Sequence, residues 1–558
     1  MIKKINFTAA FLLACALGQA QVTEWAGKFG GDGEDVVLGV HADAQGYTYT
    51  TGYFSNNCDF DLGDPDYILS TGIPFQTFVQ KNDPDGNLIW AKSIGSEGGD
   101  NGTKITTDAH GNVYITGVFE GEGDFDPGDG EFILTSAGDL DIFIVKLNGN
   151  GELVWAKNFS GTEYEESNGI GVDDDGNIYV SGYFYDPVDF DPGNGEYEMS
   201  TAGSGDGFIV KLKNDGSFMW AKSFGGPGFD LATALKVTPD GNLYIAGNFT
   251  ETADLDPGAG EFNVSVTGDE GGAYLLHLDS NGDFVKGVNA GVSVSAVYAV
   301  GVDVDSEGSA YITGYFGGDT TFITPAGNLV MSPTEFYNSY IAKISPDGFI
   351  TWASQLQSNM LSLSYAVAVN SLDEVFVSGY FNGTLTLGEH SITEDNPGDS
   401  QNFIAKLDKN GNFISAQRFG GINFIDRCAI AIDGDDNIYV ASAFDGTVDI
   451  NPDVDNETIV TVTDFRDSFL VKMSNEILSA PDNPIVASLA LYPNPTANYI
   501  NITSREPLSG QSFTVCDMAG RQVLTGVIGP EQQISIAALQ TGIYNIMIGS
   551  SAYRIIKK

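Results

Sequence analysis

Short apolar runs separated by polar turns recur along most of this chain. Ala234–Val237 and Leu243–Phe249 flank a Pro-Asp-Gly-Asn turn, which is typical of a β-hairpin. In the segment before it, Phe208–Leu212 and Phe218–Lys222 flank an Asn-Asp-Gly turn and predict a second hairpin. Amphipathic helical spacing is nowhere sustained. The pattern therefore predicts an all-β chain whose units each contain four strands in two hairpins.

Two markers recur at a nearly constant spacing. The stretch Trp155-Ala156-Lys157 has close copies 65 residues away on either side, and all five tryptophans occupy this one position: Trp25, Trp90, Trp155, Trp220 and Trp352. A Tyr-Ile-Thr-Gly-x-Phe motif and its looser copies end in a shared phenylalanine at seven positions: Phe54, Phe119, Phe184, Phe249, Phe316, Phe381 and Phe444. Such a period indicates equivalent stacked units, and the phenylalanine count predicts seven of them.

The two ends of the repeated region predict that the units close into a ring. A Trp-Ala-Lys strand or its degenerate copy follows each earlier shared phenylalanine by about 36 residues, but at that distance after Phe444 the chain reads Ala480-Pro481-Asp482. The seventh unit therefore lacks its last strand, whereas Trp25-Ala26-Gly27-Lys28 precedes the first unit. We expect this amino-terminal strand to close a seven-bladed β-propeller, which leaves few open sheet edges. An open β-solenoid is the alternative.

The repeated motif also resembles a known family. The stretch Asp173–Gly182 is similar to the Asp-x-x-Gly-Asn-x-Tyr-Val-Thr-Gly core of the seven-bladed β-propeller repeat (SBBP-like) proteins of secreted bacterial chains. The resemblance extends from residue 22 to about residue 479. It implies the fold but says little about activity, because propellers host enzymes and binding proteins alike.

Charge divides the chain into two domains. Residues 485–558 hold 3 acidic and 5 basic side chains and residues 1–20 hold 2 basic ones, so residues 21–484 carry −50 − 4 = −54. We expect a signal peptide at 1–20, the propeller at 21–478, a linker at 479–486 and a C-terminal secretion domain at 487–558. Alternating apolar runs predict a small Ig-like β-sandwich for this last domain.

The amino terminus carries export signals. Lys3 and Lys4 precede the apolar run Phe7–Leu17, and small residues up to Ala20 complete a secretory signal peptide. Lipidation at Cys15 is the competing interpretation. No other apolar run approaches the length of a membrane-spanning helix.

Cysteines are too few for a disulfide framework. After cleavage the chain keeps Cys58, Cys428 and Cys516, and an odd, sparse set is not typical of a disulfide-stabilised scaffold. Ring closure would place Cys58 and Cys428 in adjacent blades, where the two thiols could meet.

The C-terminal part closely resembles the sorting domain of the type IX secretion system of Bacteroidetes. Four marks occur in order: Tyr492-Pro493-Asn494-Pro495, the Asp-x-x-Gly-Arg turn at Asp517–Arg521, the Leu-x-x-Gly-x-Tyr strand at Leu539–Tyr544, and Lys557-Lys558. The resemblance implies export through the periplasm and recognition by the type IX machinery. It also implies release or attachment at the outer-membrane surface after the tail is cut.

An acidic motif is the strongest candidate for chemistry. Asp124-Phe125-Asp126-Pro127-Gly128 and its copies place two carboxylates on one side of an extended segment, near glycines that admit backbone carbonyls. Such oxygen ligands could hold Ca²⁺, or the aspartates could instead cap a local turn. The candidate ligands are Asp59, Asp61, Asp124, Asp126, Glu131, Asp189, Asp191, Glu196, Asp254, Asp256 and Glu261.

The motif stops at two units. The partial copy Asp449–Asn451 extends it to the seventh unit, whereas Thr321 with Ile323 and Thr386 with Gly388 replace it in the fifth and sixth. In a closed ring the units that carry the motif are consecutive. We therefore predict one acidic arc on one face of the propeller.

No catalytic constellation stands out. The chain has 75 acidic and 25 basic residues, a balance that disfavours nucleic acid and anionic membranes and is compatible with cationic partners or simply with high solubility. The four histidines occupy unrelated phases of the repeat, and no nucleophile elbow or phosphate loop is present. The sequence favours a non-enzymatic surface binder or adhesin for an extracellular glycan or protein. The alternative is a polysaccharide-degrading propeller enzyme.

Overall fold

The computed structural model describes residues 22–475, except 64–65, 186, 267–270, 294, 395–397, 423–427, 452–457 and 463–464. In the C-terminal part it describes residues 490–492, 496, 498–503, 512–517, 521–529, 533–548 and 551–558. The predicted signal peptide and linker lie outside these residues. Packing separates two compact units, one within Ala20–Ile477 and one within Leu478–Lys558.

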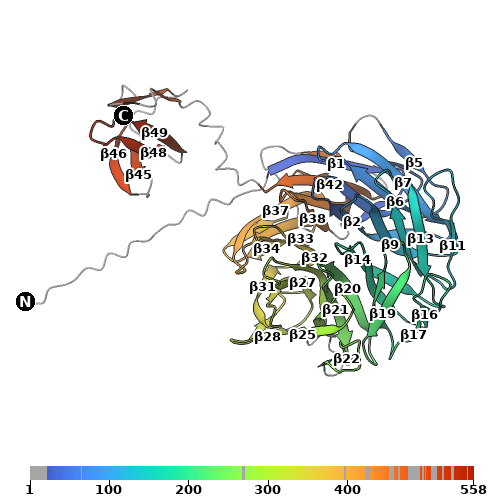
Figure 1. The fold of residues 1–558 in the computed structure, drawn as a ribbon. Helices are drawn as coiled ribbons and strands as arrows, with labels where there is room; N and C mark the ends of the chain where they lie inside the picture. Colours follow the sequence, from blue (N-terminus) through green and yellow to red (C-terminus); the bar gives the residue numbers. More distant parts are fainter. Residues whose placement is uncertain are drawn as a thin grey trace, which may run out of the picture. The chain divides into compact units, whose positions relative to one another are not determined.

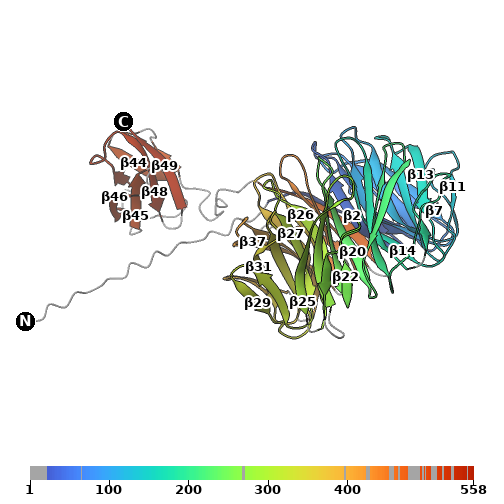
Figure 2. The same ribbon diagram turned by 60° about the horizontal axis from the view of Figure 1, so that its bottom comes forward.

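The first unit is a seven-bladed β-propeller, as predicted (Figures 1 and 2). Each blade is an antiparallel sheet of four strands that follow one another from the central axis outward. Blade 1 contains β2 (Asp35–Ala42), β3 (Thr48–Phe54), β6 (Gln76–Asn82) and β7 (Leu88–Ser96); blade 2 contains β8 (Asp100–Thr107), β9 (Val113–Phe119), β12 (Asp141–Leu147) and β13 (Leu153–Phe159); blade 3 contains β14 (Glu165–Val172), β15 (Ile178–Phe184), β18 (Asp206–Leu212) and β19 (Phe218–Phe224); and blade 4 contains β20 (Asp230–Val237), β21 (Leu243–Thr250), β24 (Gly271–Leu278) and β25 (Phe284–Ser293).

The remaining blades repeat this order. Blade 5 contains β26 (Val297–Val304), β27 (Ala310–Phe316), β30 (Asn338–Ile344) and β31 (Ile350–Ser358); blade 6 contains β32 (Leu361–Val369), β33 (Val375–Asn382), β36 (Ser400–Leu407) and β37 (Phe413–Ile422); and blade 7 contains β38 (Ala429–Ile432), β39 (Ile438–Phe444), β42 (Asp467–Ser474) and β1 (Val22–Gly31).

The amino-terminal strand closes the ring, which confirms the prediction from the phase of the two ends. β1 pairs antiparallel with β42 from Val22↔Ser474 to Phe29↔Ser468, and the two strands lie side by side in Figure 1. The last blade therefore takes its outer strand from the start of the chain. An edge that would otherwise be open is paired.

A short hairpin follows the second strand of every blade, and most of these hairpins extend the sheet of the preceding blade. The sequence did not predict this connection. For example, β10 pairs with β7 through Gly123↔Ser96 and Asp124↔Gly95. The hairpins are β4 (Asn57–Asp59) with β5 (Ile68–Ser70), β10 (Glu122–Asp124) with β11 (Ile133–Thr135), β16 (Val188–Asp189) with β17 (Glu198–Met199), β22 (Thr252–Asp254) with β23 (Asn263–Ser265), β28 (Thr320–Thr324) with β29 (Gly327–Met331), β34 (Thr384–Leu387) with β35 (His390–Thr393), and β40 (Thr447–Asp449) with β41 (Ile459–Thr461). We call the end of the propeller that carries these hairpins the hairpin face, and the opposite end the turn face.

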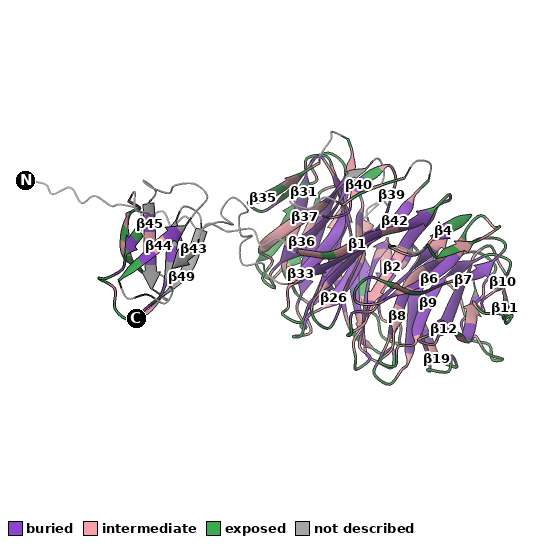
Figure 3. Cartoon of the chain, turned by 90° about the horizontal axis from the view of Figure 1, so that it is seen from above, coloured by how far each residue is buried: buried purple, intermediate pink, exposed green. Residues whose placement is uncertain are grey.

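The core lies within and between the blades. All seven shared phenylalanines are at most 1% exposed, and each ends or nearly ends the second strand of its blade. The second and third strands of the blades, such as β9 and β12, are mainly buried, whereas outer hairpin strands such as β35 are largely exposed (Figure 3). The recurring phenylalanine is therefore a packing position.

The recurring tryptophan joins neighbouring blades on the turn face. The Trp155 indole Nε1 donates to the Asn214 carbonyl of the next blade at 3.1 Å, and a Cβ at Gly216 would lie 3.2 Å from the indole ring. Gly216 also has φ of 77°, which disfavours other residues. Trp90 with Gly151 and Trp352 with Gly411 repeat this contact. The tryptophan and the turn glycine recur together because each fits the other across a blade interface.

Replacement of Trp155 by alanine should therefore destabilise the propeller by about 3 kcal/mol, the usual loss for a large aromatic in a core. The side chain is buried and its hydrogen bond crosses blades. The measurement is the urea midpoint at constant m-value. Val154→Ala is the matched control, because Val154 is 50% exposed. Equal midpoints for the two variants would show that the tryptophan does not hold the blades together.

Closure does not bring the two propeller cysteines together. Cys58 packs among Phe29, Phe54 and Phe60 near the outer edge of blade 7, whereas Cys428 precedes the innermost strand of that blade and lines the axis. Both are buried free thiols. The suggested contact is wrong, because the chain segment after β3 leaves its own blade to form the β4–β5 hairpin against β1.

The C-terminal unit contains two antiparallel sheets. One has the order β43 (Ala490–Tyr492), β44 (Tyr499–Thr503), β47 (Gln533–Ser535); the other has the order β46 (Gln522–Val527), β45 (Ser512–Asp517), β48 (Gly542–Ile548), β49 (Ser551–Lys557). Residues of both sheets, including Ile500, Val515 and Ile546, contribute to one buried cluster. The finer assignment as an Ig-like sandwich stays a prediction.

Candidate functional site

The acidic motif forms a turn at the tip of each hairpin in which it occurs. Asp124 Oδ1 accepts hydrogen bonds from the backbone N–H groups of Asp126 at 2.9 Å and Phe132 at 2.8 Å. Asp126 Oδ1 accepts one from Gly128 at 2.9 Å. The motifs at Asp59, Asp189 and Asp254 repeat all three bonds. One oxygen of each aspartate thus shapes the loop, as the turn interpretation predicts.

The placement of the motif follows the predicted arc. Its hairpins belong to blades 7, 1, 2, 3 and 4, which are consecutive around the ring. In blades 5 and 6 the hairpins β28–β29 and β34–β35 are longer regular ladders. The exposed Glu131, Glu196 and Glu261 lie in the loops between the paired strands. Calcium binding by these residues stays a prediction, and calorimetry tests it. Among the described residues no three carboxylate, imidazole or thiol side chains group as ligands of one metal ion.

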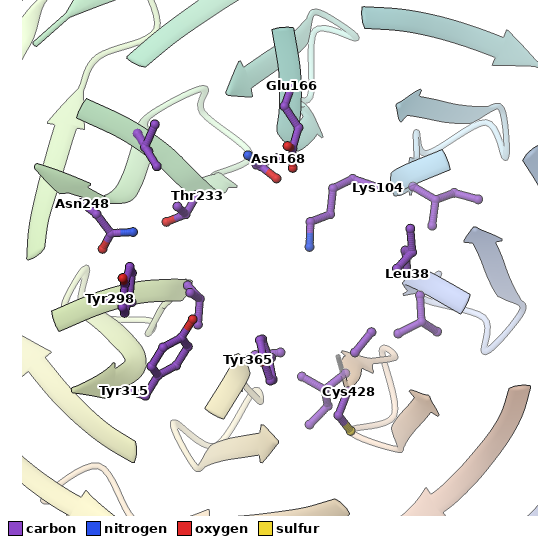
Figure 4. Close-up of a pocket in the computed structure, with 18 of the residues that line it drawn as sticks. Leu38, Lys104, Glu166, Asn168, Thr233, Asn248, Tyr298, Tyr315, Tyr365 and Cys428 are labelled. Carbon is purple, nitrogen blue, oxygen red and sulfur yellow. The ribbon is translucent and has the colours of Figure 1, made fainter. Parts of the chain in front are cut away.

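A cavity of about 300 Å³ lies on the propeller axis. Residues on or just before the first strands of all seven blades contribute to its wall, together with residues from the second strands of blades 3, 4 and 5. Figure 4 shows Lys104 of blade 2 extending into its centre, with Glu166 and Asn168 of blade 3 beside it. Tyr298 and Tyr315 of blade 5 line another side. Pockets of this size, with a few polar groups that converge, are the usual binding sites of small ligands.

Glu166 is held in place by two tyrosines. Its Oε2 accepts hydrogen bonds from the Tyr164 hydroxyl at 2.6 Å and the Tyr183 hydroxyl at 2.5 Å. Burial, and then the charge of Glu166, raise the pKa of both tyrosines above the ordinary value. Both hydroxyls therefore stay protonated donors at neutral pH. The bonds leave Oε1 of Glu166 as the atom that could face a ligand.

The amides of the cavity are also oriented by the scaffold. Asn248 Oδ1 accepts the backbone N–H of Ala299 at 2.7 Å, so its nitrogen is the end that can donate to a ligand. Asn168 uses its nitrogen to donate to the Ala232 carbonyl at 3.4 Å, so its oxygen can accept. Both contacts cross to the next blade. The pocket therefore offers fixed donors and acceptors on two neighbouring blades.

Aromatic rings cluster on the opposite side of the pocket. The ring centroids of Tyr298 and Tyr315 are 4.9 Å apart, and Tyr365 lies 6.1 Å from Tyr315 and 5.9 Å from Tyr380. Further out, the hairpin face carries large exposed rings before the first or third strand of several blades: Phe75, Phe229, Phe336 and Phe465, each between 41% and 62% exposed. Aromatic surface thus continues from the pocket onto this face.

The polar residues of the repeat motif serve structure on the turn face. Asp173 accepts the Tyr179 hydroxyl at 2.9 Å and the backbone N–H of Asn177 at 2.8 Å, and Lys211 Nζ lies 4.8 Å from the Tyr179 ring centroid. In blade 4, His277 replaces the lysine and stacks on Tyr244 at 4.3 Å. Burial lowers the pKa of His277. This histidine therefore takes the packing place of the lysine.

Models of known protein families match both the propeller and the C-terminal part of the chain. The model of the β-propeller repeat matches residues 154–183, and the model of the secretion system C-terminal sorting domain matches residues 490–558. The chain is an SBBP-type propeller protein with a type IX secretion sorting domain. This propeller protein is therefore exported, and it is secreted or attached at the outer-membrane surface. Among the described residues, no helix has both the length and the apolar character that crossing a membrane requires.

The chain also has more distant similarities. An uncharacterised WD repeat-containing protein of Acanthamoeba polyphaga mimivirus is 23% identical over 468 residues, which is 75% of this chain and 30% of that protein. The propeller protein thus spans about a third of this relative. PorZ, a surface component of the type IX secretion system of Porphyromonas gingivalis, is 10% identical with a TM-score of 0.27, over 94% of this chain and 81% of its own. A PL25 ulvan lyase is 12% identical with a TM-score of 0.37, over 80% and 97%.

The sequence did not single out the axial pocket. Tyr183, Asn248 and Tyr315 all occupy the variable position just before the shared phenylalanine, and Tyr53, Val118, Tyr380 and Ala443 fill it in the other blades. Our motif treated this position as unspecified. Variation at one place in an otherwise constant motif was the available signal, because it marks a surface that differs from blade to blade.

Proposed function

We propose that this protein is a non-enzymatic, surface-displayed binding protein whose axial pocket takes one sugar unit of an extracellular glycan. The observation that carries the proposal is the division of the pocket into two kinds of wall. Tyrosine rings of blades 5 and 6 lie on one side, and Lys104, Glu166 and Asn168 lie on another. Sugars present apolar C–H faces that stack on aromatic rings and hydroxyls that pair with amides and carboxylates.

The net negative charge of the propeller favours glycans that are not polyanionic. Residues 21–484 carry −54, from the chain total of −50 less the +4 of the two ends, and this field repels polyanions. Neutral or amino sugars fit better, because the charged residues among the described lining residues are Lys104 and Glu166, which have opposite signs. The exposed rings of the hairpin face, such as Phe75 and Phe229, could contact further units of the chain.

A glycan array with the purified full-length protein tests the proposal. Tyr298→Ala and Asn168→Ala should each weaken binding at least about tenfold, the effect of losing roughly 1.4 kcal/mol. Tyr197→Ala is the matched control, because Tyr197 lies on the outer β16–β17 loop and is 42% exposed. Equal losses for all three variants would place the binding surface elsewhere.

A reducing-sugar assay on the same glycans separates binding from catalysis. The proposal predicts retention without turnover. Release of products without tight retention would favour the alternative, a polysaccharide-degrading enzyme. An array that retains no glycan, with no turnover, would remove both interpretations of the pocket.

A further inference from the structure

The interface between blades 3 and 4 buries two carboxyl groups. Asp206 begins β18, the third strand of blade 3, and Asp230 begins β20, the first strand of blade 4. Their exposed fractions are 3% and 0%. Buried carboxylates are costly unless a cation or several hydrogen bonds compensate them.

In each of these two aspartates, one carboxyl oxygen accepts a hydrogen bond and the other does not. Asp206 Oδ2 accepts the Ala202 N–H at 2.7 Å, and Asp230 Oδ2 accepts the Gly226 N–H at 2.6 Å. Oδ1 of both aspartates is buried and receives no hydrogen bond from the described residues. Both groups also face one point, because a Cβ at Gly225 would lie 2.5 Å from Asp206 Oδ1 and 3.0 Å from Asp230 Oδ2.

The equivalent interface between blades 7 and 1 has a lysine beside its carboxyl pair. There Asp467 and Asp35 occupy the same strand positions, and Lys28 Nζ lies 2.5 Å from Asp467 Oδ2. Lys28 is three residues after Trp25, whereas the residue three after Trp220 is Ser223. The ammonium group that neutralises one carboxyl pair therefore has no counterpart on β19 at the other.

An ion could reach Asp206 from the hairpin face, beside Gly225, which lies between Asp206 and Asp230. A cavity of about 240 Å³ is lined by Asp206, Ser223, Thr201, Asp254 and Asp256. The last two belong to the acidic hairpin motif, whose second carboxyl oxygens are not used by the three bonds that shape the loop. Their charges raise the local concentration of cations at the mouth.

We propose that Asp206 and Asp230 bind one divalent cation, Ca²⁺, between blades 3 and 4. The donor set consists of oxygen atoms, which suits a hard cation, and Ca²⁺ tolerates irregular coordination that water and backbone carbonyls complete. The site differs from the turn motif at Asp254 and Asp256, which would supply attraction at the entrance. The ion would take the place that Lys28 fills at the other interface.

Thermal unfolding and calorimetry of the full-length protein test this site. Millimolar Ca²⁺ at pH 8 should raise the melting temperature by a few degrees relative to EDTA through mass action, and calorimetry should show a binding event that Asp206→Asn and Asp230→Asn each remove. Asp254→Asn with Asp256→Asn should weaken the affinity without abolishing it. If calcium is bound by the turn motifs instead, the double variant would lose only the part of the heat that its own turn contributes, and the two interface variants would keep all of it.

Ser223→Lys is a second, independent variant, because it retains both carboxyl groups. It should raise the melting temperature in EDTA, as Lys28 stabilises the other interface, and it should abolish the calcium response. A parent protein that neither binds Ca²⁺ nor melts higher with it would overturn the proposal. So would a calcium response that survives both Asp206→Asn and Ser223→Lys.

Discussion

Deletion of Val22–Gly31 is expected to abolish cooperative unfolding of the propeller. These residues form β1, which pairs with β42 along almost its whole length and places Phe29 at 1% exposure in the blade core. Without β1 the outer edge of β42 is unpaired, and the β4–β5 hairpin loses the strand against which it pairs. The deletion removes the backbone hydrogen bonds of β1, its aromatic packing and the closure of the ring. The resulting loss of stability should therefore exceed that of any single substitution.

Urea unfolding followed by tryptophan fluorescence measures this effect. A peptide with the sequence of residues 22–31 should restore part of the transition when added in excess, because it can occupy the vacant edge. The same peptide with Trp25 and Phe29 replaced by serine is the control and should not. A truncated protein with the parent's midpoint would show that closure contributes nothing to stability.

The propeller should become less stable as the pH rises from about 4 to about 7. Burial, and then the charge of Asp467, raise the pKa of Asp35 to about 7, and burial raises the pKa of Asp100 to about 7. In this window the folded protein binds more protons than the unfolded chain, so the free energy of unfolding falls with pH. Each carboxyl would cost up to about 4 kcal/mol above pH 7, because one pKa unit corresponds to about 1.4 kcal/mol.

The surroundings of Asp100 and Asp35 determine which of the two is the better residue to substitute. Asp100 accepts the backbone N–H groups of Thr77 at 2.6 Å and Ser96 at 2.7 Å. Asp35 lies near Asp467, whose charge Lys28 balances, and near Cys58, whose pKa burial raises. Asp35→Asn removes a buried charge and leaves the donors of Asp100 intact. It is therefore the cleaner substitution.

Unfolding free energies at pH 5 and pH 8, in calcium-free buffer, measure the effect. Asp35→Asn should reduce the difference between the two pH values and raise stability at pH 8. Asp32→Asn is the control: Asp32 is exposed and hydrogen bonds from Asn57 lower its pKa, so it has little titration left between these pH values. Stability that is flat or rises from pH 5 to pH 8 would contradict the prediction.

The fold was predictable because the positions that build it repeat. The shared phenylalanine, the tryptophan and the turn glycine recur in most blades because each blade must pack on the next one in the same way. The phase of Trp25 relative to Phe444 was enough to predict closure. The hairpin that joins each blade to its predecessor was not predicted, because its strands have only two to five residues.

The candidate sites were harder to predict because they depend on differences between blades. The repeated aspartates were the predicted metal ligands, yet one oxygen of each accepts hydrogen bonds that shape a turn. The pocket residues Lys104, Asn248 and Tyr315 stand at positions that vary from blade to blade, and only the ring brings them together. Asp206 and Asp230 each begin a strand, and their proximity depends on how blade 3 packs against blade 4.

Binding by a protein with a filled pocket tests the central claim most directly. Leu38 and Val300 line the pocket on different blades, and Leu38→Trp or Val300→Trp would occupy its volume without changing the outer hairpins. Calorimetric titration with the best glycan from the array should detect no binding to either variant, at melting temperatures close to that of the parent. Parental affinity in both folded variants would show that the ligand binds elsewhere on the propeller.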